Sequence, residues 1–210
     1  MKFIQLCFLS SVLVLLNTKP LQGTKPETVV DRHGKPLESG KGYYVWQFWA
    51  DDIGGLTLGS TRNKTCPLDV IRNPKQLGTP VYFFAPSFDH IPTQTDLSIK
   101  IRFRSSPCKQ SKVLKLSKEG SGFWFVSTGG AVGDLVSKFK IEKLEGDTGI
   151  PIYIFKFCPS VPGALCAPVQ TFTDTDGTKV MVVGDGDDLE PYYVRFQRVS
   201  TFTPKKSIVN

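Results

Sequence analysis

The sequence predicts an all-β protein, a barrel or a sandwich of short strands, and three observations indicate this class. No stretch of the 210 residues keeps an apolar stripe at helical spacing over three turns. Short apolar runs recur instead, and several alternate with polar residues as half-buried strands do. Turn-forming Gly, Pro, Asp and Asn separate these runs at short intervals, which is typical of barrels and sandwiches.

We expect the strands to follow the apolar runs in chain order. The clearest run alternates so that its apolar side chains, Leu97, Ile99, Ile101 and Phe103, take one face, and Ser98, Lys100, Arg102 and Arg104 take the other. The expected strands lie at Tyr43–Phe48, Leu56–Leu58, Val81–Phe84, Leu97–Phe103, Val113–Leu116, Phe123–Val126, Phe139–Ile141, Ile152–Phe157, Val180–Val183 and Tyr192–Phe196.

An internal repeat narrows the architecture. An aromatic-rich strand that follows turn residues occurs three times, as GYYVWQF at 42–48, GFWFVS at 122–127 and PIYIFKF at 151–157. Threefold recurrence in a chain of this length favours a β-trefoil of about twelve short strands with pseudo-threefold symmetry. A closed barrel of this kind also removes the edge strands that promote aggregation.

Residues 1–23 are predicted to be a secretory signal peptide. Lys2 supplies a positive start, Phe3 to Leu16 form an apolar run too short for a membrane span, and Gly23 precedes the expected cut. No later segment reaches membrane length, so we expect one domain over 24–210, secreted as a monomer with no membrane partner. The formal charge of +7 falls to +5 once Lys2 and Lys19 leave with the leader.

Four cysteines remain after the leader and Cys7 are removed, and an even number in an oxidising compartment predicts two disulfides. Four cysteines allow three connectivities. The Pro- and Gly-containing spacing from Cys158 to Cys166 suits a small closed loop, which leaves Cys66 and Cys108 for a long one. No CxxC pair and only two histidines occur, so neither a metal site nor a cofactor is predicted. Asn63 begins an Asn-Lys-Thr sequon and is the expected glycosylation site.

The segment from Val29 to Val45 carries the strongest motif, with the turn Asp31-Arg-His-Gly34, the step Pro36-Leu37 and the pair Tyr43-Tyr44. Together with Gly54-Gly55-Leu56, Cys66-Pro67-Leu68 and Phe157-Cys158-Pro159, it closely resembles the soybean-type Kunitz inhibitor family of plants. The resemblance covers nearly all of residues 28–199. It implies a β-trefoil with bridges Cys66–Cys108 and Cys158–Cys166, and we expect the protein in the apoplast or the vacuole.

Members of that family inhibit serine proteases with a rigid surface loop that enters the enzyme as a substrate would, so the resemblance implies a serine protease as partner. The corresponding loop here is residues 85–96. An ungapped alignment back from Leu97 puts Ser87 at the primary specificity position, whereas an alignment anchored on Pro86 puts Phe88 there. The expected reactive segment is therefore Pro86, Ser87, Phe88 and Asp89.

This sequence departs from the family pattern in two ways. Neither Ser87 nor Phe88 is the cation that trypsin-like enzymes require, so the expected preference is chymotrypsin-like for Phe88 or elastase-like for Ser87. The family typically places an asparagine at the position of Ser39, where its amide braces the reactive loop from beneath. Serine has a shorter side chain with a single hydrogen-bond donor, so Ser39 is expected to support the loop more weakly.

The main alternative function is a non-inhibitory trefoil of miraculin-like or storage type, in which residues 85–96 form an ordinary exposed loop. A carbohydrate-binding trefoil needs exposed aromatics, whereas most aromatics here fall on strand positions expected to be buried. The basic run from Lys109 to Lys118, with Lys100, Arg102 and Arg104, is interpreted as a solvated strand face, and no nucleic-acid partner is predicted.

Two further chemistries are not expected. The acidic turns between Asp174 and Glu190 lack the spacing of a calcium-binding loop. Because His33 and His90 have no serine or cysteine nucleophile motif near them, the protein is not predicted to be an enzyme.

Overall fold

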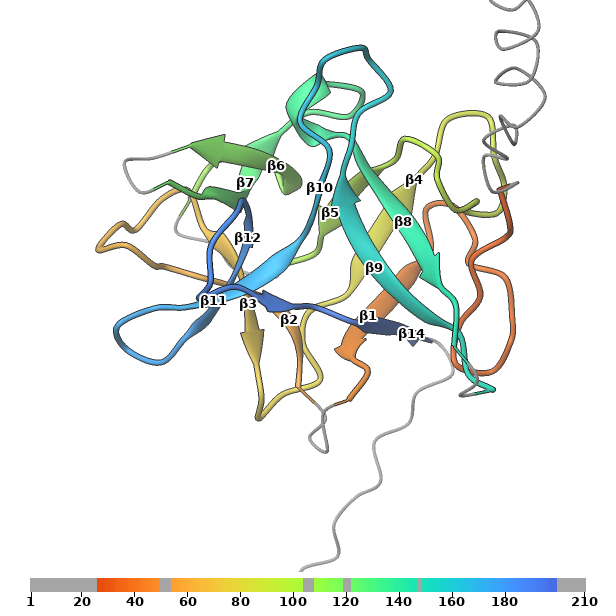
Figure 1. Ribbon diagram of the computed structural model, residues 1–210, viewed down its shortest axis with the longest axis horizontal. Helices are drawn as coiled ribbons and strands as arrows, with labels where there is room; N and C mark the ends of the chain where they lie inside the picture. Colours follow the sequence, from red (N-terminus) through yellow and green to blue (C-terminus); the bar gives the residue numbers. More distant parts are fainter. Residues whose placement is uncertain (1–25, 50–53, 104–107, 119–121, 147–148, 200–210) are drawn as a thin grey trace, which may run out of the picture.

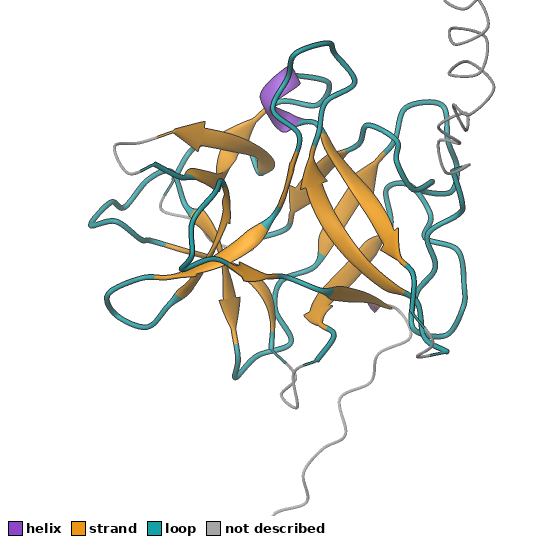
Figure 2. Ribbon diagram, in the orientation of Figure 1, coloured by secondary structure: helices purple, strands orange, loops and turns teal. Residues whose placement is uncertain are grey.

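The computed structural model describes residues 26–49, 54–103, 108–118, 122–146 and 149–199, and within them the all-β class is confirmed (Figure 1). The predicted signal peptide and Arg104 lie outside these ranges. The described part of the chain has one short 3₁₀ helix, η1 (Leu135–Ser137), drawn in purple in Figure 2. None of its helices is long and apolar enough to cross a membrane.

The strands, in chain order, are β1 (Gly42–Gln47), β2 (Gly55–Gly59), β3 (Asp69–Asn73), β4 (Val81–Phe84), β5 (Ser98–Ile101), β6 (Val113–Lys118), β7 (Trp124–Gly130), β8 (Phe139–Leu144), β9 (Ile152–Phe157), β10 (Ala167–Pro168), β11 (Gln170–Thr173), β12 (Lys179–Val183), β13 (Glu190–Pro191) and β14 (Val194–Arg198). Each of the expected apolar runs overlaps one of these strands.

Six of the strands close into an antiparallel barrel. Its members pair in the order β1, β4, β5, β8, β9 and β14, and β14 returns to β1. The join between β5 and β8 is a single bridge, in which Leu97 and Phe139 exchange two backbone hydrogen bonds of 2.9 Å. Within the described residues, every barrel strand therefore has a neighbour on both sides.

Three hairpins cap one end of the barrel: β2 with β3, β6 with β7, and β11 with β12. The second strands of the three hairpins also pair with one another, because β3 contacts β7, β7 contacts β12, and β12 contacts β3. The units β1–β4, β5–β8 and β9–β14 are thus arranged with pseudo-threefold symmetry, which confirms the predicted β-trefoil.

The core fills the barrel with aromatic and branched side chains. The ring of Phe83 lies 5.5 Å from that of Phe196, at an interplanar angle of 85°, and 6.1 Å from that of Phe155. Complete burial of side chains of this size contributes about 2 kcal/mol each to folding. Where the three repeats meet, apolar side chains leave a cavity of only about 20 Å³, so the interior is close-packed.

Two buried tyrosines connect this core to the segment that precedes β1. The Tyr43 hydroxyl accepts the backbone N–H of Glu38 at 2.9 Å, and the Tyr153 hydroxyl accepts that of Val30 at 3.0 Å. Burial raises the pKa of both phenols, so they remain neutral hydrogen-bonding groups. The N-terminal segment is therefore fixed to the barrel before it meets the loop described below.

The expected alternation holds within β5, with one informative exception. Leu97, Ile99 and Ile101 are buried, and Lys100 is exposed. Ser98 takes the opposite face as expected, yet it is buried because the loop after β7 covers it and the Gly133 N–H donates to its hydroxyl at 3.3 Å. The sequence did not predict β3, β10, β11 or β13, which are short and rich in polar residues or proline.

Candidate functional site

The loop that joins β4 to β5 holds the predicted reactive segment and projects from the barrel beside the N-terminal segment (Figure 1, upper right). Its tip is exposed from Pro86 to His90, and Phe88 has 47% of its surface accessible. Ala85 and Ile91, on either side of this tip, are buried. A short exposed tip thus stands between two buried anchors.

The tip begins with a tight turn. The Ala85 carbonyl accepts the Phe88 N–H at 3.3 Å, and Ser87, the third residue of the turn, has a φ of +67°. Proline in the second position and a positive φ in the third are the signature of a type II turn. The proline ring of Pro86 limits the backbone at the start of the turn. Ser87 occupies a backbone region that costs a non-glycine residue about 1 kcal/mol.

The descending limb of the loop is hydrogen-bonded to the N-terminal segment at every second residue. Asp89 O accepts the Ser39 N–H at 2.7 Å, and Ile91 O accepts the Val29 N–H at 2.8 Å. The Ile91 N–H donates to the Leu37 carbonyl at 2.8 Å. Because Val29, Leu37 and Ile91 are each fully buried, the two bonds at Ile91 are shielded from water.

Two residues farther on, Thr93 continues this pairing. Its N–H donates to the Glu27 carbonyl at 2.7 Å, and its hydroxyl accepts the Glu27 N–H at 2.9 Å. The sequence did not predict the bracing role of Glu27, Val29 and Leu37, although Val29 and Leu37 belong to the motif at 29–37. The brace thus consists mainly of backbone groups.

Ser39 lies under the loop, but its two polar groups act at different points. Its backbone N–H contacts the loop at Asp89, as described, whereas its hydroxyl lies 3.5 Å from the carbonyl of Phe83, inside β4. The side chain therefore contacts the stem of the loop and makes no hydrogen bond to Ser87 or Phe88. Ser39 thus supports the loop through its backbone more than through its side chain.

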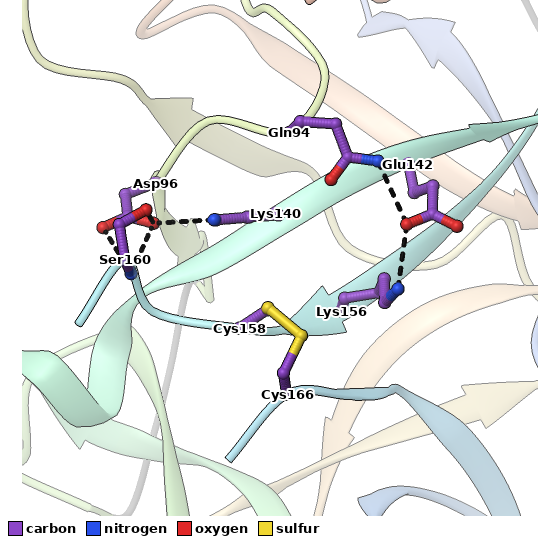
Figure 3. The surroundings of a disulfide bond; sticks show 8 residues. All are labelled: Gln94, Asp96, Lys140, Glu142, Lys156, Cys158, Ser160 and Cys166. Carbon is purple, nitrogen blue, oxygen red and sulfur yellow. Dashed lines mark hydrogen bonds and ion pairs between the residues drawn. A yellow bond between two sulfur atoms is a disulfide. The ribbon is translucent and has the colours of Figure 1, made fainter. Parts of the chain in front are cut away.

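The far end of the loop is connected to β8 and β9 by two polar clusters (Figure 3). Gln94 donates from its backbone N–H to Ile141 O, and from Nε2 to Glu142 Oε2 at 3.0 Å. The Lys156 ammonium reaches the same carboxylate at 2.9 Å. Burial acts to raise the pKa of Glu142, but the hydrogen bonds from Gln94 and Lys156 outweigh it, and the pKa is lowered.

Asp96 connects the loop to the segment closed by the second disulfide. Its carboxylate accepts both the N–H and the hydroxyl of Ser160, and it lies 3.4 Å from the Lys138 ammonium and 3.6 Å from that of Lys140. Burial acts to raise the pKa of Asp96, yet the Ser160 hydrogen bonds and the two cations lower it overall. Both ends of the loop at 85–96 are therefore held by the body of the protein.

Both expected disulfides are present. Cys66 and Cys108 join the loop before β3 to the segment before β6, with their Cα atoms 5.8 Å apart. Cys158 and Cys166 close the short loop between β9 and β10, beside Ser160 (Figure 3). Asn63, the sequon residue, is exposed in a turn with a φ of +54°.

The acidic turns have a local structural role. The Asp174 carboxylate accepts the Thr175 N–H, and the Asp176 carboxylate accepts the Thr178 N–H, both at 2.8 Å. These bonds shape the hairpin turn between β11 and β12. In the described ranges, no three His, Cys, Asp or Glu side chains gather in a way that could hold a metal ion.

A six-stranded barrel with a three-hairpin cap, and one exposed loop braced along its length, define a β-trefoil of the protease-inhibitor class. Residues 29–198 match the family model of legume Kunitz trypsin and protease inhibitors, and the chain belongs to this family. Several of its relatives are inhibitors by name, whereas miraculin and a water-soluble chlorophyll protein from Brassica oleracea are not.

The similarity extends over most of the chain. Miraculin from Synsepalum dulcificum is 31% identical and covers 93% of this chain and 95% of its own length. Kunitz trypsin inhibitor 5 from Arabidopsis thaliana is 32% identical, with 82% and 86% covered. The crystal structure of alocasin, a protease inhibitor from giant taro (Arum macrorrhizon), superposes with a TM-score of 0.68 at 26% identity and covers 82% of this chain and 99% of its own.

Proposed function

We propose that this protein is a secreted inhibitor of serine endopeptidases, that it acts through the loop at 85–96, and that it has no catalytic activity of its own. The observation that carries the proposal is the combination of an exposed tip with anchors on both sides. A loop that is already ordered loses little conformational entropy when a protease binds it. After cleavage, the hydrogen bonds at Asp89, Ile91 and Thr93 would keep the new end in place and allow the bond to re-form.

Phe88 is the residue that we assign to the primary specificity pocket. A peptide that pairs with a protease runs extended, and Ser87 has a left-handed φ that does not suit this path. Phe88 follows the turn and exposes a large ring. An aromatic residue fits the hydrophobic slot of chymotrypsin-like enzymes, whereas the acid in a trypsin pocket requires a cation.

Inhibition constants of the mature chain against chymotrypsin, elastase and trypsin test this assignment. Phe88→Ala should weaken chymotrypsin inhibition about 30-fold, since an aromatic anchor is worth about 2 kcal/mol. Leu135→Ala, at a residue of the same 47% exposure on η1, is the matched control and should have no effect. Phe88→Arg should create trypsin inhibition. Strong trypsin inhibition by the unmodified protein, unchanged by either Phe88 variant, would show that another surface binds the protease.

We also propose that the leader is removed and that the mature chain, beginning near Thr24, is a secreted monomer glycosylated at Asn63. The support is the n-region and apolar run of residues 1–23, and the exposure of the sequon. The intact mass of the secreted protein, before and after treatment with a glycosidase, tests both the cut and the occupancy. A mass that retains residues 1–23 would contradict removal of the leader. A mass that glycosidase treatment leaves unchanged would contradict glycosylation at Asn63.

A second candidate function is that of a non-inhibitory, miraculin-like protein. Two observations favour it: the extent of the similarity to miraculin, and the failure of the Ser39 side chain to reach the loop tip. The two candidates differ in the fate of the loop. An inhibitor should be cut slowly and reversibly at one bond, whereas a loop without an inhibitory role should be either inert or degraded.

A further inference from the structure

A hollow of about 350 Å³ lies on the outer face of the barrel, over β4, β5 and the segment that leads into β6. Its lining combines two aromatic side chains with three cations: Tyr82, Phe84, Lys100, Arg102 and Lys112. Among the described residues, no acidic side chain lines it. It lies outside the proposed reactive tip, although Phe84 directly precedes the loop.

The two rings point outward because they alternate along β4 with the buried residues Val81 and Phe83. Tyr82 pairs with Gly42 across the sheet, and a side-chain carbon at Gly42 would stand 3.2 Å from the Tyr82 ring. Glycine at this position therefore lets the ring lie against the backbone of β1. Tyr82 and Phe84 both remain half-exposed, so they are exceptions to the expected burial of most strand aromatics.

The cations stand around these rings. Lys100 pairs directly with Tyr82 in the adjacent strand, and Arg102 Nη1 lies 3.5 Å from the Tyr82 hydroxyl. The Lys112 ammonium is held at the edge by the Phe103 carbonyl at 2.6 Å. In the part of the chain that the structure describes, none of the three has an acidic partner within ion-pair distance. Three uncompensated charges in one concave surface attract an anion.

We propose that this hollow binds a segment of an anionic polysaccharide, a chain of sugar rings that carry carboxylate or sulfate groups. The apolar C–H faces of such rings pack against Tyr82 and Phe84, and the anionic groups pair with Lys100, Arg102 and Lys112 in charge-assisted hydrogen bonds. A single-stranded nucleic acid would offer the same charges and could stack its bases on the same two rings, so it is the competing ligand in the test below.

Calorimetric titration of the full mature protein tests the proposal, in about 0.15 M salt so that unspecific surface attraction is screened. Oligogalacturonate supplies carboxylates, a heparin oligosaccharide supplies sulfates, and fully methyl-esterified oligogalacturonate is the neutral control. We expect binding to at least one of the two anionic chains and none to the neutral one. Comparison of the affinities for oligogalacturonate and heparin shows whether carboxylate or sulfate is the preferred anionic group.

Variants locate the site. The double variant Lys100→Gln/Arg102→Gln should lose at least about tenfold in affinity, because each lost charged contact is worth roughly that factor. Lys35→Gln/Lys75→Gln removes the same charge from exposed residues elsewhere and should change affinity less than about twofold. Tyr82→Leu keeps an apolar side chain but removes the ring, and it should weaken binding several-fold.

Three outcomes would overturn the proposal. The first is the absence of binding to both anionic chains. The second is an equal loss of affinity in the two double variants, which would indicate general surface charge. The third is equal or tighter binding of a single-stranded DNA of matched charge.

Discussion

The two disulfides should differ in their contribution to stability, and the structure allows the difference to be calculated. Cys66 and Cys108 are 42 residues apart in the sequence, whereas Cys158 and Cys166 are 8 apart. With closure entropy that grows as 1.5R ln n, the long bridge contributes about 4 kcal/mol and the short one about 2.5 kcal/mol. The expected difference is about 1.5 kcal/mol.

The surroundings of the bridges act in the same direction. Cys108 is buried and its bridge connects two of the three repeats, so its loss frees a long segment of chain. The short loop keeps an independent attachment after its bridge is removed, because Ser160 remains hydrogen-bonded to Asp96.

Paired Cys→Ser variants of each bridge, unfolded in guanidinium chloride with the other bridge intact, measure the difference. The variant without Cys66–Cys108 should have the lower free energy of unfolding, as extrapolated to water. An equal or larger loss from removal of Cys158–Cys166 would refute the reasoning.

Three other changes have outcomes that the structure sets. Asp69 is fully buried and accepts hydrogen bonds from Arg62 and Ser127. Asp69→Asn should therefore lower the free energy of unfolding by about 3 kcal/mol. A loss below about 1 kcal/mol would contradict a stabilising role for this buried ion pair. A side-chain carbon at Gly55 would stand 2.1 Å from the Leu77 carbonyl oxygen. Gly55→Ala should therefore lower the free energy of unfolding, measured by thermal unfolding, by more than about 2 kcal/mol. Gly146→Ala, where the side chain would enter open space, is the control and should change it by less than about 0.5 kcal/mol. Because the pKa of Asp96 is lower in the folded protein, its stabilisation is complete above the ordinary value of 3.8 and is lost as the pH falls below it. Asp96→Asn should therefore flatten the acid side of a plot of melting temperature against pH, and an unaltered acid side would show that other carboxylates dominate.

Most of the fold could be predicted from local pattern, and the exceptions are set by distant contacts. The alternation from Leu97 to Ile101 reports directly which face is buried, because a strand repeats every two residues. β3 was missed because it begins with Asp69, a residue that patterns assign to the surface. Its burial depends on Arg62 and on Ser127 of β7, which no local window contains.

The candidate site divides in the same way. The loop was predicted from a family motif and from the count back from Leu97, and the reactive segment at its tip stays a prediction. The brace did not, because the pairing of Val29, Leu37 and Ile91 joins segments whose mutual register only the folded backbone defines. The left-handed φ of Ser87 is likewise defined only by the folded backbone, and our proposal of Phe88 rather than Ser87 rests on it.

Closure of the barrel depends on the pairing of its first strand with its last, from Tyr43 with Arg198 to Gln47 with Val194. During synthesis, β1 and β9 lack this neighbour until β14 has left the ribosome. Pairing over so long a span is slow, since the entropy of loop closure must be overcome before the contacts form. The barrel therefore closes only once β14 is available, and until then β1 and β9 expose strand edges that are paired in the folded barrel.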